Sequence, residues 1–279
     1  MAETIASRAF EPIHKAHAID QVAVAVIFDR QLDDDALRAA KEVIGKPEEL
    51  PGRTELRGVS IQIGSTSPTP AVPTLPAVAG YGFTKVQPDG FLETELHIQR
   101  SAITFRTLFY TRWANVWGQA KRYIDAVLPL YLQSGARLNQ VSLNYVDKFV
   151  SSALVEECRP TEILKKDSPF LCSNIFGSND LWHCHSGRFE RRNDTTKRLI
   201  TVNVDFISET IHEQDRRTVV IASVIADLFN QATYSPFDLD PNDAPRTIDA
   251  CFQGLHEADK DVLRSIISDD MSRRIALGS

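Results

Sequence analysis

Two histidines flank a cysteine in the segment Trp182-His183-Cys184-His185. The segment is typical of a strand, in which side chains alternate between two faces, so His183 and His185 share one face and Cys184 lies on the other. Two imidazoles on one face supply two ligands to zinc or another divalent ion, whereas a catalytic zinc needs a third ligand and a structural zinc a fourth. Three residues are candidate further ligands without diagnostic spacing: Glu190, Asp205 and His212.

This cluster has two interpretations. The first is a metal site at His183 and His185, which would serve a metal-dependent hydrolase acting on phosphoesters or nucleotides. The second, which we favour, is a half-exposed strand that carries two polar histidines and no cofactor. In either case both histidines face a groove only if Cys184 points into the core.

A basic segment follows, with five cationic residues around a turn: Arg188, Arg191, Arg192, Lys197 and Arg198. Against Glu190 and Asp194 they leave a net charge of +3 over eleven residues. A protruding basic hairpin can hold nucleic-acid phosphates while Phe189 stacks on a base. The favoured alternative is a charged sheet edge that discourages pairing with other strands.

An aromatic stripe runs along the strongest helical pattern of the chain. Trp113 and Trp117 recur at helical spacing together with Tyr110, Tyr123 and Tyr131. Such a stripe is typical of a helix face packed on a sheet. If part of it is exposed, Trp113 and Trp117 are the candidate partner contacts, because tryptophan and tyrosine are enriched in protein interfaces.

The common catalytic motifs are missing from the sequence. It contains no P-loop, no dinucleotide-binding glycine fingerprint, no H-E-x-x-H and no G-x-S-x-G. The paired acids Asp259 and Asp261 are interpreted as a solvated helix face, and Glu93 and Glu95 as a solvent-facing strand edge. We therefore predict no catalytic residue.

Composition and charge narrow the class of protein. The 279 residues are 43% hydrophobic and 24% charged, which is ordinary for a folded domain, and the net charge of −6 argues against a protein that coats nucleic acid or anionic membrane. No apolar run approaches a membrane span, and the first residues do not resemble a signal peptide. Four cysteines without a C-x-x-C pair are expected to be reduced thiols. A cytoplasmic protein without disulfides is expected.

The first half of the chain predicts strands, helices and an extended loop. Strands are expected at 21–29, 56–63, 80–86 and 93–108, the last two joined by a turn at Asp89-Gly90. A helix follows Asp33, and a longer one covers 113–131, with Pro129 near its end. Residues 65–79 hold four prolines and are predicted to form a loop.

The second half predicts the same order of elements. Strands at 139–147, 180–190 and 198–207 are expected, with a short helical stretch at 161–165, a long helix at 215–231 and a final helix at 250–268.

The fold class is therefore predicted as α+β, with two similar strand–helix–strands–helix subdomains and a C-terminal helix. Each subdomain would hold a mainly antiparallel sheet covered by one long amphipathic helix. Residues 1–136, with the loop 65–79, form the first and residues 137–279 the second. Strands 22–28 and 141–149 would be equivalent, and the helices at 112–132 and 215–231 would be related by a pseudo-twofold axis. A ligand site is expected in a groove between the halves.

Several short motifs resemble a sporadically distributed family of uncharacterised bacterial proteins of similar length. They are Gly82-Phe83, Asp89-Gly90, Ile103-Thr104-Phe105, Tyr110 with Trp113, Leu143-Asn144-Tyr145-Val146-Asp147, and Leu255-His256. The resemblance implies a bacterial origin and covers nearly the whole chain. It carries over no catalytic residue.

These observations favour a non-enzymatic binding or accessory protein that acts through a surface or a groove between its halves. A protein partner or self-association as a dimer is expected, nucleic acid is the weaker alternative, and no membrane partner is expected. The metal-dependent hydrolase and the nucleic-acid binder remain the two alternatives.

Overall fold

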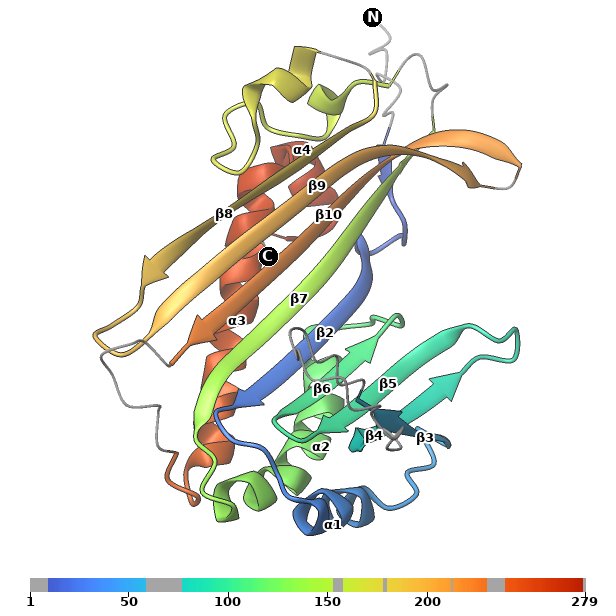
Figure 1. Ribbon diagram of the computed structural model, residues 1–279. Helices are drawn as coiled ribbons and strands as arrows, with labels where there is room; N and C mark the ends of the chain where they lie inside the picture. The colour runs from blue at the N-terminus through green and yellow to red at the C-terminus, as the bar shows by residue number, and fades with distance from the viewer. Residues whose placement is uncertain are drawn as a thin grey trace, which may run out of the picture.

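A single antiparallel sheet contains strands from both halves of the chain (Figure 1). The computed structural model describes residues 10–58, 77–152, 158–177, 180–211, 213–229 and 239–277. Within these ranges the order of strands is β3-β4-β5-β6-β2-β7-β10-β9-β8, and β1 also pairs with β7. The strands are β1 (Phe10–Pro12), β2 (Ile19–Phe28), β3 (Gly52–Arg57), β4 (Val78–Val86), β5 (Leu92–Gln99), β6 (Ala102–Thr107), β7 (Leu138–Ser151), β8 (Trp182–Arg191), β9 (Lys197–Ile211) and β10 (Gln214–Leu228).

Helices cover one face of this sheet. Figure 1 shows α2 and α3 on the same side, behind the strands. The helices are α1 (Asp34–Ile44), α2 (Trp113–Gln133), α3 (Ala244–Ile266) and α4 (Asp269–Arg274), with 3₁₀ turns at Pro160–Glu162 and Ser173–Gly177. The described molecule therefore has two layers, one of strands and one of helices.

The core lies between the two layers, and β7 shows how the sequence places it there. Val141, Leu143, Tyr145, Asp147 and Phe149 are buried, whereas the residues that alternate with them are partly exposed. This alternation is what a strand with one covered face requires. β7 pairs with β2 on one side and with β10 on the other, so it joins the two halves of the chain.

Many of the predicted elements are confirmed. β2 and β7 occupy the expected places, and α1 begins after Asp33, whose carboxylate accepts a hydrogen bond from the Ala36 amide at 2.8 Å. Gly90 has φ of 89°, a conformation that glycine adopts without a steric cost in the predicted turn. The loop prediction falls mostly on residues 59–76, outside the described part of the chain, while Val78 and Ala79 begin β4.

The segment predicted as one strand at 93–108 forms two strands. β5 ends at Gln99 and β6 begins at Ala102, and the two pair with each other. The connection is held from the side: the Tyr131 hydroxyl donates to the Gln99 carbonyl, and the Arg100 guanidinium donates to the carbonyls of Val78 and Leu32, each at 3.0 Å.

The long helix predicted at 215–231 is wrong. Residues 214–228 form β10, which pairs with β9 along its length and with β7 from Thr218 to Leu228. The run around Val219-Val220-Ile221 is apolar at nearly every position, so it satisfies a helical period and an alternating period equally well. The β-branched side chains decide between them, because they fit a pleated sheet better than a helix.

This strand overturns the predicted fold class. A second half without its long helix cannot repeat the first, so the two similar subdomains with one covering helix each are not present. The described residues instead form a large antiparallel sheet, covered on one face by α2 from the first half and α3 from the second. The pseudo-twofold relation between 112–132 and 215–231 is lost with it. The final helix is confirmed as α3, although it begins six residues earlier than predicted, with Pro245 in its first turn.

None of the helices in the described ranges is long and apolar enough to span a bilayer.

Candidate ligand-binding cavity

A cavity of about 560 Å³ opens between the two layers, where β7, the start of α2 and the C-terminal part of α3 meet. Its lining includes His17, Tyr110 and Trp113 from the first half and Tyr145, Asp147, His256 and Asp259 from the second. We call it the Asp147 cavity. Two carboxyl groups, two imidazoles and three other aromatic rings thus face one space.

Asp147 occupies a core position of the sheet. It follows Tyr145 by two residues on β7, so it points toward the helices among apolar neighbours, and it is 3% exposed. Its Oδ1 atom is buried and has no hydrogen-bond partner among the described residues. Burial, with a smaller contribution from the negative charge of Asp259, raises the pKa of Asp147 well above its ordinary value.

Asp259 provides the second carboxyl group, from the opposite layer. It lies on the buried stripe of α3 with Leu255 and Val262, and its Oδ1 accepts a hydrogen bond from the Ser223 hydroxyl of β10. Burial raises the pKa of Asp259 to about 7. The interpretation of Asp259 as part of a solvated helix face is wrong, whereas Asp261 is exposed as expected.

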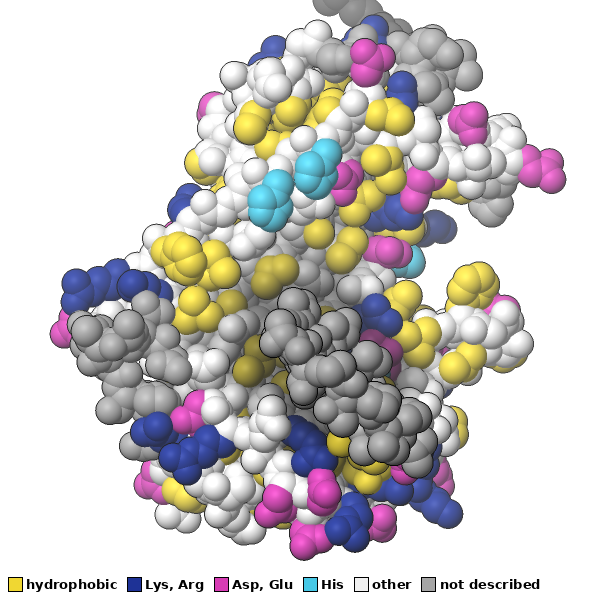
Figure 2. All heavy atoms as spheres, viewed as in Figure 1, with side chains coloured by type: hydrophobic (Ala, Val, Ile, Leu, Met, Phe, Trp, Pro, Cys, Tyr) yellow, Lys and Arg dark blue, Asp and Glu magenta, His cyan; other side chains and the backbone are white. Residues whose placement is uncertain are grey.

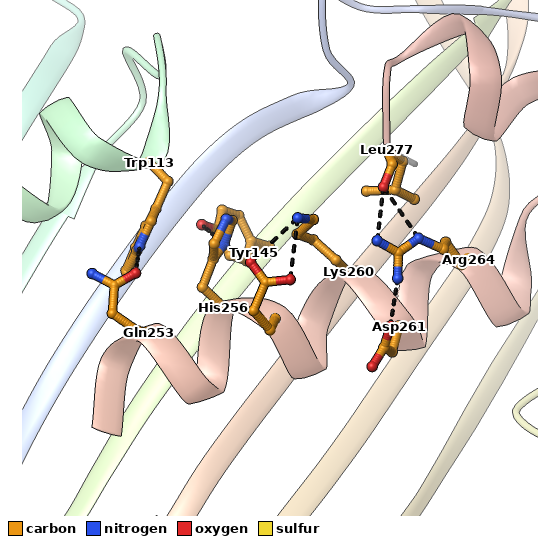
Figure 3. Close-up of polar contacts among 9 residues, drawn as sticks. Trp113, Tyr145, Gln253, His256, Lys260, Asp261, Arg264 and Leu277 are labelled. Carbon is orange, nitrogen blue, oxygen red and sulfur yellow. Dashed lines mark hydrogen bonds and ion pairs between the residues drawn. The ribbon is translucent and has the colours of Figure 1, made fainter. Parts of the chain in front are cut away.

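An aromatic stack fixes one wall of the cavity (Figure 3). The indole of Trp113 lies flat against the ring of His256, with centroids 4.7 Å apart, and its Nε1 donates to Gln253 Oε1 at 2.9 Å. The Tyr145 hydroxyl and His256 Nδ1 share a hydrogen bond of 3.1 Å. Burial lowers the pKa of His256 to about 4, so its imidazole is neutral at neutral pH.

A second wall of the cavity is formed by His17, which precedes β2, and Tyr110, which lies between β6 and α2. Their rings meet edge to face with centroids 5.1 Å apart, and Tyr110 also contacts Tyr145 in this way. Burial is the main cause that lowers the pKa of His17, and its Nδ1 atom is buried without a hydrogen-bond partner among the described residues. Both unpartnered atoms, this nitrogen and Asp147 Oδ1, therefore belong to residues that line one cavity.

Two cationic side chains also line the cavity. Lys260 is partly exposed, and its Nζ lies 3.2 and 3.3 Å from the two carboxylate oxygens of Glu257. Arg112 is exposed at the start of α2. Neither forms an ion pair with Asp147 or Asp259 in the described structure. The interior of the cavity thus combines acidic groups with neutral imidazoles and aromatic rings.

The histidines of the predicted metal site lie elsewhere, on β8. His183 and His185 are exposed, and Cys184 is buried, as expected if the cysteine points inward. His183 Nδ1 lies 2.5 Å from Asp205 Oδ1 on the neighbouring strand β9. In the described ranges no group of three or more histidine, cysteine or acidic residues is arranged to hold a metal ion. Figure 2 shows histidine side chains on the face opposite the helices. The metal site stays a prediction with two candidate ligands.

The basic segment forms the hairpin of β8 and β9 at one edge of the sheet. Most of its charge is balanced: Arg188 pairs with Glu190 at 2.8 Å, and Arg191 pairs with Asp194 at 2.5 Å. Arg198 is buried, and two of its nitrogens donate to the Asp227 carboxylate at 2.8 Å each. The exposed Arg192 and Lys197 complete the set. The pattern matches a charged edge strand, and binding of nucleic acid stays a prediction.

Trp113 and Trp117 lie in the interface between α2 and α3. They are 9% and 4% exposed, their rings stack at 5.7 Å, and Trp117 also packs on Phe252 with centroids 4.4 Å apart. Trp117 Nε1 donates to Asp249 Oδ1 at 2.5 Å. The two tryptophans are buried where two helices of this chain meet, as the interpretation of the stripe as core expects, and their role as partner contacts stays a prediction.

Sequence reasoning missed most of the Asp147 cavity. The signal for Asp147 was present, because its position follows Val141, Leu143 and Tyr145 in the buried phase of an alternating strand. A charge in that phase marks a buried carboxyl group. His17 and Asp259 could not be placed in this way, since the first lies outside a periodic element and the second shares α3 with exposed acids.

Comparisons of the sequence with models of protein families and with curated proteins give no match.

Proposed function

We propose that the chain is a non-enzymatic binding protein whose ligand occupies the Asp147 cavity. One observation carries the proposal: a buried carboxylate oxygen without a hydrogen-bond partner belongs to a residue that lines a cavity of ligand size. An unpaired buried oxygen costs about 1 to 3 kcal/mol, and a ligand that donates a hydrogen bond to it would remove this cost. The cavity volume lies within the range of ordinary small-molecule sites.

The position of the cavity supports the same function. Its walls come from residues 16–19 and 110–113 on one side and from β7, α3 and residues 275–277 on the other. A site between the two halves is what the sequence led us to expect, although the halves are not repeats.

Binding without catalysis is supported by the pairing of the titratable groups. His256 shares its hydrogen bond with the Tyr145 phenol, and burial raises the pKa of that phenol well above its ordinary value. Such a phenol is a poor proton donor at neutral pH. A histidine that acts as a general base needs a neighbouring nucleophile to deprotonate, and the Tyr145 phenol that His256 contacts is a poor one.

Two broader features belong to this proposal. None of the four cysteines forms a disulfide within the described residues, which fits a reducing cytoplasm. Phe109 and Phe189 are 60% and 65% exposed and offer apolar contacts for a protein partner or a second copy of the chain. We also propose a bacterial origin, on the resemblance of the short sequence motifs to a bacterial family.

A fragment screen by ligand-observed NMR tests the proposed function. The substitution Ala16→Trp places a large ring at an exposed residue that lines the cavity, so it should block entry without disturbing the core. Ala126→Trp is the matched control, because Ala126 is exposed on α2 and does not line the cavity. We expect fragments that bind the natural chain and the Ala126→Trp variant, and lose at least tenfold in affinity in the Ala16→Trp variant. A screen without a hit, or hits that bind all three proteins equally, would overturn the proposal.

A further inference from the structure

We propose that the Asp147 cavity selects an organic cation with at least one N–H group, a protonated primary or secondary amine. This inference rests on the proposed function and adds the chemistry of the ligand. The geometry that points to it is a pair of buried carboxyl groups, from β7 and α3, in a cavity whose other walls carry aromatic and apolar side chains and, at Arg112 and Lys260, two cationic ones.

The first step concerns charge. Asp147 and Asp259 face the cavity from opposite layers. They lie close enough together for the negative charge of Asp259 to raise the pKa of Asp147. Among the described residues neither has a cationic partner, and burial disfavours the charged form of both, so a charged carboxylate at either position needs a cation beside it. Lys260 is engaged by Glu257, and Arg112 is exposed at the start of α2. A cation that enters the cavity would supply the missing partner.

The second step concerns hydrogen bonding. Asp147 Oδ1 is an acceptor without a donor. An ammonium N–H group can donate to it, whereas a quaternary ammonium group has no hydrogen to donate. His17 Nδ1 is a second unpartnered atom at the cavity, and a neutral imidazole nitrogen can accept a hydrogen bond. Backbone hydrogen bonds with Tyr110 and Ile19 raise the pKa of His17 in part, so the acceptor that favours an amine with N–H groups over a fully alkylated one is Asp147 Oδ1.

The third step concerns the remaining walls, which suit the carbon skeleton of an amine. Ile19, Leu263 and Leu277 line the cavity together with the ring of Tyr110. These side chains can cover an alkyl or aryl group, and the tyrosine ring attracts a cation weakly through its face. The ring of Trp113 adds little of this kind, since it already stacks with the rings of His256 and Trp117.

The other titratable groups that line the cavity include two cations, Arg112 and Lys260, which oppose a cationic ligand, and four groups without a positive charge at neutral pH. His17, Tyr110, Arg112, Tyr145, His256 and Lys260 accompany the two aspartates. The imidazoles are neutral at neutral pH, because burial lowers the pKa of both. Burial raises the pKa of both aspartates, so an ammonium ion should lower the pKa of the carboxyl group that it contacts and displace a proton from it. Up to one proton is then released for each amine bound.

Isothermal titration calorimetry of the full chain at pH 7 and low salt tests the inference. The probes are butylamine, 1,4-diaminobutane and 2-phenylethylamine, each compared with the corresponding alcohol or diol, and trimethyl(2-phenylethyl)ammonium as a cation without N–H. We expect at least one amine to bind at least tenfold more tightly than its alcohol, and the quaternary cation to bind at least tenfold more weakly than 2-phenylethylamine. Repeating the titration in buffers of different ionisation enthalpy should show proton release.

Variants locate the effect. Asp147→Asn should reduce amine affinity at least tenfold, while Asp261→Asn, which removes an exposed carboxylate from the same helix as Asp259, should leave it unchanged. The alcohol and quaternary probes test the inference on the natural chain even if the Asp147→Asn variant does not fold.

The failures of the two proposals can be told apart. If alcohols or anionic fragments bind as well as amines and Ala16→Trp blocks them, the cavity is a binding site and the amine inference is wrong. If no amine binds while the fragment screen gives hits that Ala16→Trp blocks, the amine inference alone is again wrong. If no compound of any class binds, both proposals fail.

Discussion

Asp259 places a carboxyl group at a helix position where its neighbours on the same stripe, Leu255 and Val262, are apolar. The Ser223 hydroxyl compensates part of its desolvation by donating to Oδ1. The rest is compensated by protonation, since burial raises the pKa of Asp259 to about 7. At the residue scale the cavity is therefore an acidic site whose charge depends on pH and on what occupies it.

The substitution Asp259→Asn should change how stability depends on pH. A carboxyl group whose pKa is raised on folding contributes stability that is fully present below its unfolded pKa of 3.8 and is lost as the pH rises through about 7. Asparagine does not titrate, so the difference in unfolding free energy between the variant and the natural chain should grow in favour of the variant from pH 4 to pH 8. The difference between the unfolded pKa of 3.8 and the folded pKa of about 7 corresponds to a change of about 4 kcal/mol in the unfolding free energy.

Urea unfolding followed by circular dichroism at several pH values measures this difference. Asp261→Asn serves as the control, because its carboxylate is exposed and its removal should give a difference that does not depend on pH. A constant difference for Asp259→Asn across the same range would contradict the prediction.

The four thiols should react at very different rates. Cys172 is exposed, Cys158 and Cys184 are buried, and burial raises the pKa of Cys251 to about 11. Because the thiolate is the reactive form, iodoacetamide at pH 8 should modify Cys172 first. Peptide mass spectrometry after short reaction times locates the label. In the Cys172→Ser variant the fast labelling should disappear. Labelling of Cys158 as fast as that of Cys172 would contradict the prediction, because Cys158 is buried.

The site could be predicted from the sequence only in part. The strand phase of Cys184 and the core position of the tryptophans followed from periodicity, and both are confirmed. The cavity itself depends on residues far apart in sequence, such as His17, Tyr145 and Asp259, which meet only because α3 lies across β7. No local pattern records such a meeting.

At the scale of elements, the packing of α2 on α3 should carry a large share of stability. Phe252 is fully buried on α3 against Trp117 of α2. Removal of a buried phenylalanine ring leaves a cavity, so Phe252→Ala should reduce the unfolding free energy by about 3 to 5 kcal/mol. Phe189→Ala, at a ring that is 65% exposed, should change it by less than about 0.5 kcal/mol. Urea denaturation compares the two, and equal effects would mean that the helix interface is not well packed.

The error at β10 shows where prediction of elements fails. β2, β7 and α2 have one period each, and their types follow from the sequence. In 218–229 most side chains are apolar, so period alone cannot separate a buried helix from a central strand. The hydrogen bonds of β10 with both β7 and β9 settle the matter, and these are contacts between distant segments.

At the scale of the molecule, the sheet makes the two halves of the chain depend on each other. β7 belongs to the second half of the sequence, yet its Leu143 pairs with Val24 of β2, which belongs to the first half. The other side of β7 pairs with β10, where Leu143 lies opposite Ile225. The helix layer repeats this arrangement, because α2 and α3 share the Trp117–Phe252 contact. Separation at residue 136 would expose the middle of the sheet and the middle of the helix layer together.

The whole chain should therefore unfold in one cooperative transition. Differential scanning calorimetry should give a calorimetric enthalpy equal to the van't Hoff enthalpy within error, as for a two-state protein. Tryptophan fluorescence provides an independent check, because Trp113 and Trp117 report on the helix layer and Trp182 on β8 near the sheet edge. Urea curves from fluorescence and from circular dichroism should coincide. Two separated calorimetric transitions, or a fluorescence midpoint that differs from the circular dichroism midpoint, would show that residues 1–136 and 137–279 behave as separate folding units after all.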